Sequence, residues 1–202
     1  LMQLLKLFLQ KIRKSRNCKD KRIDFLNLIL QINIQKKEIS GVEVGVLNGD
    51  YSKKIHNYFK YLKLNLFLVD MWESTNDFKE YDQKSLDDAY KKVQEYFNKF
   101  ENVNILRLSS LEASSRFENN SLDFFYIDGN HKYEFVKQDL HIWYDKLKTH
   151  GVLFGDDYSR NYGVHRAVSE FSFEKKLIVK FSDNFKHYGL IKYHNNVFRK
   201  YH

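Results

Sequence analysis

The chain has no proline and a single cysteine, Cys18, among its 202 residues. Without proline it cannot carry the Asp/Asn-Pro-Pro-aromatic motif of enzymes that modify the amino groups of nucleic-acid bases. One cysteine excludes an intrachain disulfide and suits a reducing compartment. No apolar run approaches the roughly 20 residues that a membrane span needs. The order of apolar and basic residues at 1–20 is the reverse of a secretory signal, so we expect a cytoplasmic location.

Positive charge is concentrated at the start of the sequence. The net charge is +8, and residues 1–40 hold ten Lys/Arg and three Asp/Glu, which leaves the remainder nearly balanced. This pattern does not favour a nucleic-acid-binding surface over the whole protein. The basic segment is either a solubilising helix face or a contact for an anionic partner, such as the cytoplasmic face of a membrane.

Alternating strand-like and helix-like segments predict the fold class. Strands are expected at 42–46, 64–70, 103–108, 122–128 and 151–155, followed by a hairpin of 177–181 and 187–193 with its turn at 182–185. Helices are expected at 1–12, 23–34, 51–62, 85–100, 111–117, 131–147 and 162–173. This order predicts a doubly wound, Rossmann-like α/β fold with a seven-stranded, mostly parallel sheet, a C-terminal antiparallel hairpin and helices on both faces. We expect a helical extension at 1–35 and one domain at 36–202.

A glycine-containing loop follows the first predicted strand. Gly45 and Gly49 let the backbone approach a ligand closely, and Asp50 or Ser52 is expected to cap the next helix. The spacing is not that of a nicotinamide dinucleotide site. Asp70 ends the second predicted strand, where a carboxylate can accept hydrogen bonds from both hydroxyls of a ribose. The alternative for Asp70 is a turn or helix-capping role.

Carboxylates follow the fourth and fifth predicted strands. Asp128 ends one strand, and Asp156 and Asp157 end the other, so the three are expected to lie together at one edge of a parallel sheet. A divalent cation, Mg²⁺ or Mn²⁺, would relieve their repulsion with oxygen ligands. The alternative is that Lys or Arg side chains neutralise them.

His131 follows Asp128 by three residues, at the start of a predicted helix. Its imidazole can reach the same pocket and take up a proton near neutral pH, which predicts a general base. A capping or packing role is the alternative. The other seven histidines are expected to lie away from these carboxylates.

Four blocks of sequence together resemble class I S-adenosylmethionine-dependent methyltransferases. The blocks are Glu43-Val-Gly45-Val-Leu-Asn-Gly49, Val69-Asp70-Met71-Trp72, Tyr126-Ile-Asp128-Gly-Asn-His131-Lys-Tyr-Glu134 and Gly151-Val-Leu-Phe-Gly155-Asp156-Asp157-Tyr158. They are most similar to the small-molecule and sugar O-methyltransferases that carry an Ile-Asp-Gly-x-His motif, such as macrolide-sugar methyltransferases.

The resemblance implies a role for each matching residue. Cofactor-binding residues would be Glu43, Gly45, Gly49, Asp70, Trp72, Ser110 and Asp128. Metal ligands would be Asp128, Asp156 and Asp157, and the catalytic residues would be His131 and Asp128.

These observations predict a metal-dependent O-methyltransferase that uses S-adenosylmethionine and Mg²⁺ or Mn²⁺. The expected acceptor is a small molecule, a sugar or a glycan precursor, in surface-glycan or natural-product biosynthesis. The alternatives are a non-catalytic nucleoside-binding protein with a relic site, and an RNA or protein methyltransferase. A homo-oligomer and peripheral membrane contact through the basic segment are further expectations.

Overall fold

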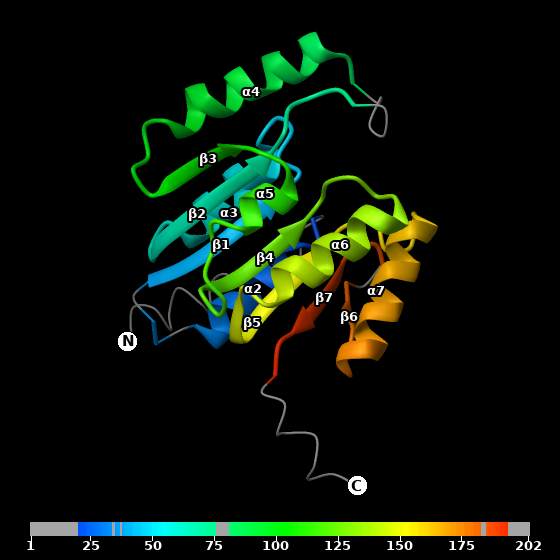
Figure 1. Ribbon diagram of the computed structural model, residues 1–202. Helices are drawn as coiled ribbons and strands as arrows, with labels where there is room; N and C mark the ends of the chain where they lie inside the picture. The colour runs from blue at the N-terminus through cyan, green and yellow to red at the C-terminus, as the bar shows by residue number, and fades with distance from the viewer. Residues whose placement is uncertain (1–19, 34, 37, 76–80, 183–184, 194–202) are drawn as a thin grey trace, which may run out of the picture.

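The computed structural model describes residues 20–33, 35–36, 38–75, 81–182 and 185–193. Seven strands form one mixed sheet with helices on both faces (Figure 1). The strands are β1 (Glu38–Val44), β2 (Lys63–Asp70), β3 (Val103–Arg107), β4 (Leu122–Ile127), β5 (Leu147–Gly155), β6 (Lys180–Phe181) and β7 (Tyr188–Ile191). The helices are α2 (Ile23–Ile32), α3 (Asp50–Phe59), α4 (Gln83–Phe97), α5 (Ser110–Ser114), α6 (Tyr133–Tyr144) and α7 (Tyr162–Lys175).

The strand order is β3-β2-β1-β4-β5-β7-β6. The first five of these strands pair in parallel, and β7 pairs antiparallel with both β5 and β6. This confirms the predicted doubly wound sheet with its antiparallel hairpin. The order reverses between β1 and β4, whose last residues, Val44 and Ile127, are register partners. Open α/β sheets bind ligands at the carboxyl ends of the strands beside such a reversal.

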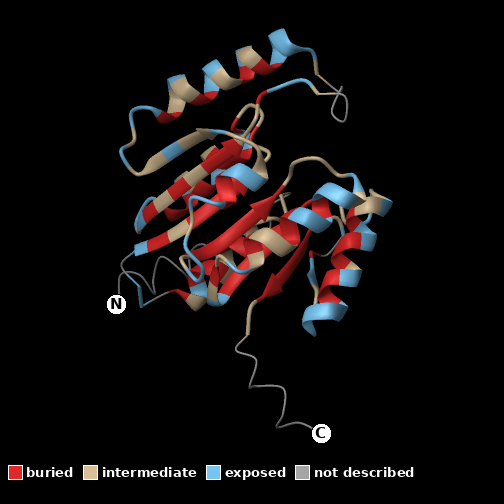
Figure 2. Cartoon of the chain, viewed as in Figure 1, coloured by how far each residue is buried: buried red, intermediate tan, exposed pale blue. Residues whose placement is uncertain are grey.

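Side chains that alternate along the strands fill two hydrophobic layers. In β4, Phe124 and Tyr126 belong to a cluster that α2, α3 and α4 cover, whereas Phe125 and Ile127 belong to a cluster that α5, α6 and α7 cover. Every residue of β4 is buried, as Figure 2 shows for the strand at the centre of the sheet. Burial on both faces explains why the central strands read as continuous apolar runs.

Several predicted boundaries differ from the structure, among them β1, which runs from Glu38 to Val44 and not from 42 to 46. β5 begins at Leu147, four residues before the predicted start, and α6 ends at Tyr144. Leu147 fits the helical spacing of the preceding apolar residues, but it is fully buried and pairs with Leu122 of β4. The N-cap of α3 is Gly49 and not Asp50 or Ser52. The predicted helix at 1–12 and positions 183–184 of the predicted turn lie outside the described residues.

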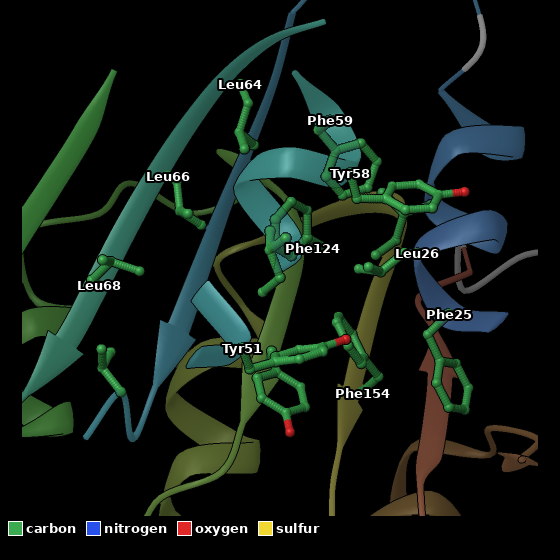
Figure 3. Close-up of a cluster of buried hydrophobic side chains, with 14 of the residues drawn as sticks. Phe25, Leu26, Tyr51, Tyr58, Phe59, Leu64, Leu66, Leu68, Phe124 and Phe154 are labelled. Carbon is green, nitrogen blue, oxygen red and sulfur yellow. The ribbon is translucent and has the colours of Figure 1, made fainter. Parts of the chain in front are cut away.

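Helix α2 packs into the same hydrophobic cluster as the sheet. Phe25 stacks on Phe154 of β5 with ring centroids 5.6 Å apart, and Leu26 lies among the aromatic side chains of this cluster (Figure 3). The predicted boundary at 35/36 stays a prediction, although the described part of the extension contributes to the core of the domain. Within the described ranges, no helix combines the length and apolar character needed to cross a membrane.

Candidate functional site

The loop between β1 and α3 lies where the strand order reverses. Gly45 has a φ of 86° and donates its amide to the carbonyl of Val69, at 3.0 Å. A Cβ on Gly45 would lie 2.1 Å from the carbonyl oxygen of Asp128. Gly49 has a φ of 72° and begins α3 as its N-cap. The fold itself therefore requires both glycines. Gly45 allows the close contact between the ends of β1 and β4, and Gly49 allows the left-handed turn into α3.

Asp70 holds this loop in place. Its Oδ2 accepts the amides of Val46 at 2.9 Å and Leu47 at 3.0 Å, and its Oδ1 accepts the amide of Trp72 at 2.8 Å. Leu47 and Trp72 have positive φ values of 47° and 46°. The carboxylate compensates that backbone strain with three hydrogen bonds. This is the turn role left open from the sequence, and the ribose contact stays a prediction.

Glu43 lies on β1 beside the loop and is almost completely buried. Burial raises the pKa of Glu43 to about 8. Its Oε2 has no hydrogen-bond partner within the described part of the chain. A buried carboxyl oxygen without a donor is costly, so a ligand that carries N–H donors fits this position. The α-ammonium of S-adenosylmethionine is such a donor, and Glu43 therefore fits the predicted cofactor.

Two of the predicted cofactor-binding residues, Trp72 and Ser110, make contacts within the protein. Trp72 is fully buried beneath the loop, where its Nε1 donates to the carbonyl of Leu47 at 2.9 Å. Ser110, at the start of α5, donates to Asp139 at 2.5 Å and accepts from Trp143 Nε1 at 2.8 Å, so its hydroxyl faces α6. Burial raises the pKa of Asp139 to about 7. Both side chains therefore have structural partners, and their contacts to the cofactor stay predictions.

Three predicted carboxylates meet at the ends of β4 and β5. Ile127 and Gly155 are register partners, which places Asp128 and Asp156 at adjacent strand ends. Asp157 follows with a φ of 56°, and its amide donates to Asp156 Oδ1 at 2.6 Å. The sequence correctly predicted that these carboxylates lie at one edge of the sheet.

Arg22 approaches these carboxylates from the segment before α2. Its Nη1 donates to the hydroxyl of Tyr126 at 3.0 Å and lies 3.6 Å from Asp128 Oδ2 and 3.7 Å from Asp156 Oδ2. The Tyr126 hydroxyl donates to Asp128 Oδ2 at 2.8 Å. Tyr126 therefore links the guanidinium to the Asp128 carboxylate.

Lys186 and His187, just before β7, also approach these carboxylates. Lys186 Nζ lies 3.2 Å from Asp156 Oδ2 and 3.9 Å from Asp157 Oδ1, and His187 Nδ1 lies 2.8 Å from Asp156 Oδ1. Burial disfavours the ionised form of Asp156, but the contacts with His187 and the Asp157 amide lower the pKa of Asp156 to about 2. The expectation that no other histidine lies near these carboxylates is wrong, because the hairpin brings His187 back to the end of β5.

His131 lies between two of the carboxylates. Its Nε2 is 3.5 Å from Asp128 Oδ1, and its Nδ1 is 3.5 Å from Asp157 Oδ2. The Asp128 carboxylate raises the pKa of His131 above its usual value. About a third of the His131 side chain is exposed. This geometry suits a side chain that takes a proton from a bound molecule, because two carboxylates stabilise the imidazolium that forms.

Arg22, Tyr126, Lys186 and His187 are the site residues that sequence reasoning missed. Only Tyr126 had a local signal, since residues two apart on a strand point to the same face and Tyr126 precedes Asp128 by two. Arg22 and Lys186 reach the site through long-range packing of α2 and β7, which no local sequence pattern indicates.

The predicted metal ligands already have cationic side chains as neighbours. Across the described ranges, no group of three or more His, Cys, Asp or Glu side chains is arranged to hold a metal ion. Asp128 and Asp156 both face Arg22, and Asp156 and Asp157 both face Lys186. The donor set as arranged does not fit a divalent cation. Neutralisation by Arg and Lys, the alternative for this cluster, is the arrangement present.

A family model described as a methyltransferase domain matches residues 42–158. That segment includes the loop, Asp70, Ser110, His131 and the three carboxylates, and it covers more than half of the chain. The chain belongs to this methyltransferase family, and it is an S-adenosylmethionine-dependent methyltransferase with the class I fold. No curated protein sequence matches the chain at a significant level.

Solved structures share the fold at low sequence identity. The O-methyltransferase NovP superposes with a TM-score of 0.67 at 17% identity, over 86% of this chain and 80% of NovP. The SAH-bound methyltransferase PaMTH1 of Podospora anserina gives 0.58 at 14% identity, over 94% of this chain and 88% of that chain. A putative S-adenosyl-L-methionine-dependent methyltransferase of Methanococcus maripaludis gives 0.51 at 12%, over 94% and 95%.

Proposed function

We propose that this methyltransferase transfers the methyl group to a hydroxyl oxygen of a small molecule, with a sugar or glycan precursor as the favoured class. The observation that carries the proposal is the position of His131, a partly exposed base 3.5 Å from both Asp128 and Asp157 at the carboxyl edge of the sheet. A hydroxyl is a weak nucleophile until a base removes its proton, whereas an unprotonated amine or a thiolate needs no such base.

The methyl donor and the protein contribute different parts of the reaction. S-adenosylmethionine supplies a methyl group on a positively charged sulfur; the carbon–sulfur bond breaks, and its electron pair stays on the sulfur. The acceptor oxygen forms the new bond to the methyl carbon, and His131 takes the proton of the hydroxyl. Asp128 and Asp157 stabilise the imidazolium, and Glu43 together with the neighbouring loop positions the donor. The protein therefore contributes orientation and one proton transfer.

Metal dependence remains an expectation from the resemblance. Asp128, Asp156 and Asp157 already face cationic side chains, so no step of this mechanism depends on a metal. EDTA treatment followed by assay with and without Mg²⁺ tests the expectation directly. Activity that EDTA abolishes and Mg²⁺ restores would establish metal dependence. The metal would then act in addition to the proton transfer by His131.

The acceptor class rests on the resemblance and on the likeness to NovP, an O-methyltransferase. An RNA or protein acceptor is the second class, for which the basic segment at 1–40 is the supporting observation. A non-catalytic relic is disfavoured by the retained cluster of carboxylates and His131. Cytoplasmic location, membrane contact and a homo-oligomer also belong to this proposal, and residues 1–19 lie outside the described structure.

The test is to supply S-adenosylmethionine with panels of sugars and nucleotide sugars, small phenols, RNA and peptides. S-adenosylhomocysteine formation and the product mass are measured for each panel. We expect a mass gain of one methyl on an oxygen of a sugar or another small molecule. Methylated RNA or peptide as the only product would overturn the acceptor class, and cofactor binding without any product would favour a binding protein.

A further inference from the structure

We infer that Arg22 takes the place of a divalent metal at the ends of β4 and β5, so that this site carries a built-in cation. The inference rests on the proposed function, because it concerns the acceptor side of that site. It differs from the metal-dependent mechanism expected from the sequence, and it assigns a role to the segment before α2, outside the matched methyltransferase region.

The guanidinium of Arg22 is fixed in its position. Its Nε lies 2.9 Å from Asp20 Oδ1, and its Nη2 lies 2.9 Å from Asp20 Oδ2, which is a two-pronged contact. The guanidinium carbon lies 4.0 Å from the centre of the Tyr51 ring. The remaining nitrogen, Nη1, points toward Tyr126, Asp128 and Asp156. A planar guanidinium held by a carboxylate and an aromatic face is an ordered group and not a solvated side chain.

This guanidinium lies close to the position that a metal shared by Asp128 and Asp156 would take. A metal such as Mg²⁺ lies about 2.1 Å from its carboxylate oxygens. Arg22 Nη1 is already 3.6 Å and 3.7 Å from oxygens of Asp128 and Asp156. A cation bound between those oxygens would lie next to the guanidinium, and the two positive charges would repel at low solvent exposure.

Lys186 adds a second cation beside these carboxylates. Its Nζ faces Asp156 and Asp157, so each of the three predicted ligands has a cationic side chain within 4.0 Å. Asp20 shares the Arg22 guanidinium with these carboxylates and is also paired with Lys54. Cationic side chains therefore already lower the repulsion among the carboxylates, which weakens the physical reason for predicting a metal from their sequence positions.

Binding of Mn²⁺ to the full chain tests the inference without any acceptor. Mn²⁺ is titrated into wild-type protein, Arg22→Met and Lys186→Met, and free Mn²⁺ is followed by electron paramagnetic resonance. Wild-type protein should bind Mn²⁺ weakly. Arg22→Met should bind one equivalent at least about tenfold more tightly, because a repelling charge beside the carboxylates is gone.

The matched control is Lys54→Met, which also removes one positive charge near Asp20 but contacts neither Asp128 nor Asp156 in the described structure. It should bind Mn²⁺ as the wild type does. Circular dichroism and thermal melting establish whether each variant is folded. If Arg22→Met does not fold, Lys186→Met is the variant to compare with wild-type protein. Because Lys186 also faces two of the carboxylates, we expect its replacement to tighten Mn²⁺ binding.

Tight stoichiometric binding of Mn²⁺ to wild-type protein that Asp156→Asn abolishes would overturn the inference. Unchanged weak binding in the folded Arg22 and Lys186 variants would overturn it as well. Neither result depends on methyl transfer. A failure of the proposed function would appear separately, as an absence of S-adenosylhomocysteine binding or of a methylated product.

Discussion

His131 Nε2 and Asp128 Oδ1 lie 3.5 Å apart, and the carboxylate raises the pKa of the imidazole. A base with a raised pKa stays protonated to a higher pH and is inactive in that form. The rate of methyl transfer should therefore rise with pH through an apparent pKa above 6.5, the ordinary value for histidine. A pH–rate profile at saturating S-adenosylmethionine measures this.

Removal of that base should lower the rate without removing the cofactor. His131→Ala should lose about 10²–10⁴ in rate and should lose the rising part of the pH profile, with cofactor affinity largely retained. His141→Ala is the control, because His141 faces α7, where its ring packs against Phe171 and its Nε2 lies 2.9 Å from Glu174 Oε2. A rising limb that persists unchanged in His131→Ala would show that another group is the base, and His187 would be the next residue to test.

Asp70 should be required for tight binding of the cofactor. Asp70→Ala should weaken S-adenosylhomocysteine by roughly 1.5–3 kcal/mol in calorimetry, since a charged hydrogen-bond partner of the loop is lost. Asp88→Ala, an exposed carboxylate on α4, is the control. Unchanged affinity in Asp70→Ala would remove Asp70 from the site.

A second ligand separates the two roles of Asp70. The second ligand is an analogue of S-adenosylhomocysteine that lacks both ribose hydroxyls. If the Asp70 carboxylate contacts the ribose, wild-type protein should bind the analogue more weakly than S-adenosylhomocysteine, whereas Asp70→Ala should bind the two ligands equally well. If Asp70 acts only by holding the amides of Val46, Leu47 and Trp72, removal of the ribose hydroxyls should reduce the binding affinity of both proteins by the same factor.

Glu43 should make the protein less stable as the pH rises. Its carboxyl has a pKa of about 8 in the folded state against 4.5 as the reference, so the unfolded chain releases the proton first. Between these values the folded state binds more protons, and the free energy of unfolding should fall by up to about 1.4 kcal/mol per pH unit from this group. Urea unfolding at several pH values measures the slope.

Glu43→Gln should flatten that slope, because the amide cannot ionise. Glu38→Gln, at the exposed start of the same strand, should leave the slope nearly unchanged. Equal slopes for wild type and Glu43→Gln would mean that Glu43 is ionised in the folded protein. Cofactor binding should itself lower the pKa of Glu43 if the ligand's ammonium reaches Oε2, and would then reduce the slope in the wild type.

Two glycines at the junction of β1 and β4 should respond differently to alanine. Gly45→Ala should cost at least about 2 kcal/mol, since the Cβ would lie 2.1 Å from the Asp128 carbonyl at a φ of 86°. Gly129→Ala should be nearly neutral, because the nearest atom to its Cβ is 3.7 Å away. Thermal unfolding of both variants measures the difference, and similar melting temperatures would contradict it.

The alternation of apolar runs and helical stripes was enough to predict the sheet, its antiparallel end and the meeting of Asp128 with Asp156. These depend on local periodicity and on general rules of α/β topology. The start of β5 was missed because Leu147 satisfies both a helical stripe and a buried strand. Only tertiary pairing with Leu122 decides between them.

The partners of the carboxylates could not be predicted in the same way. Arg22 lies just before a predicted helix, and Lys186 lies between the predicted turn and the last predicted strand. Nothing in those local patterns specifies what the two charged groups contact. The predicted role of Trp72 has the same limit, since its burial under the loop depends on a backbone turn with positive φ. Local patterns locate the carboxylates at the strand ends, whereas the cations that meet them there depend on tertiary packing.

The carboxylates of β4 and β5 receive one cationic partner from before α2 and another from just before β7. During synthesis Arg22 leaves the ribosome long before the strands that supply Asp128 and Asp156, and Lys186 emerges after all of them. The charge balance of the site is therefore complete only when β7 has inserted beside β5. A nascent chain that stops before residue 186 would expose Asp156 and Asp157 without Lys186, so loss of the final hairpin should abolish the site even where the parallel strands have formed.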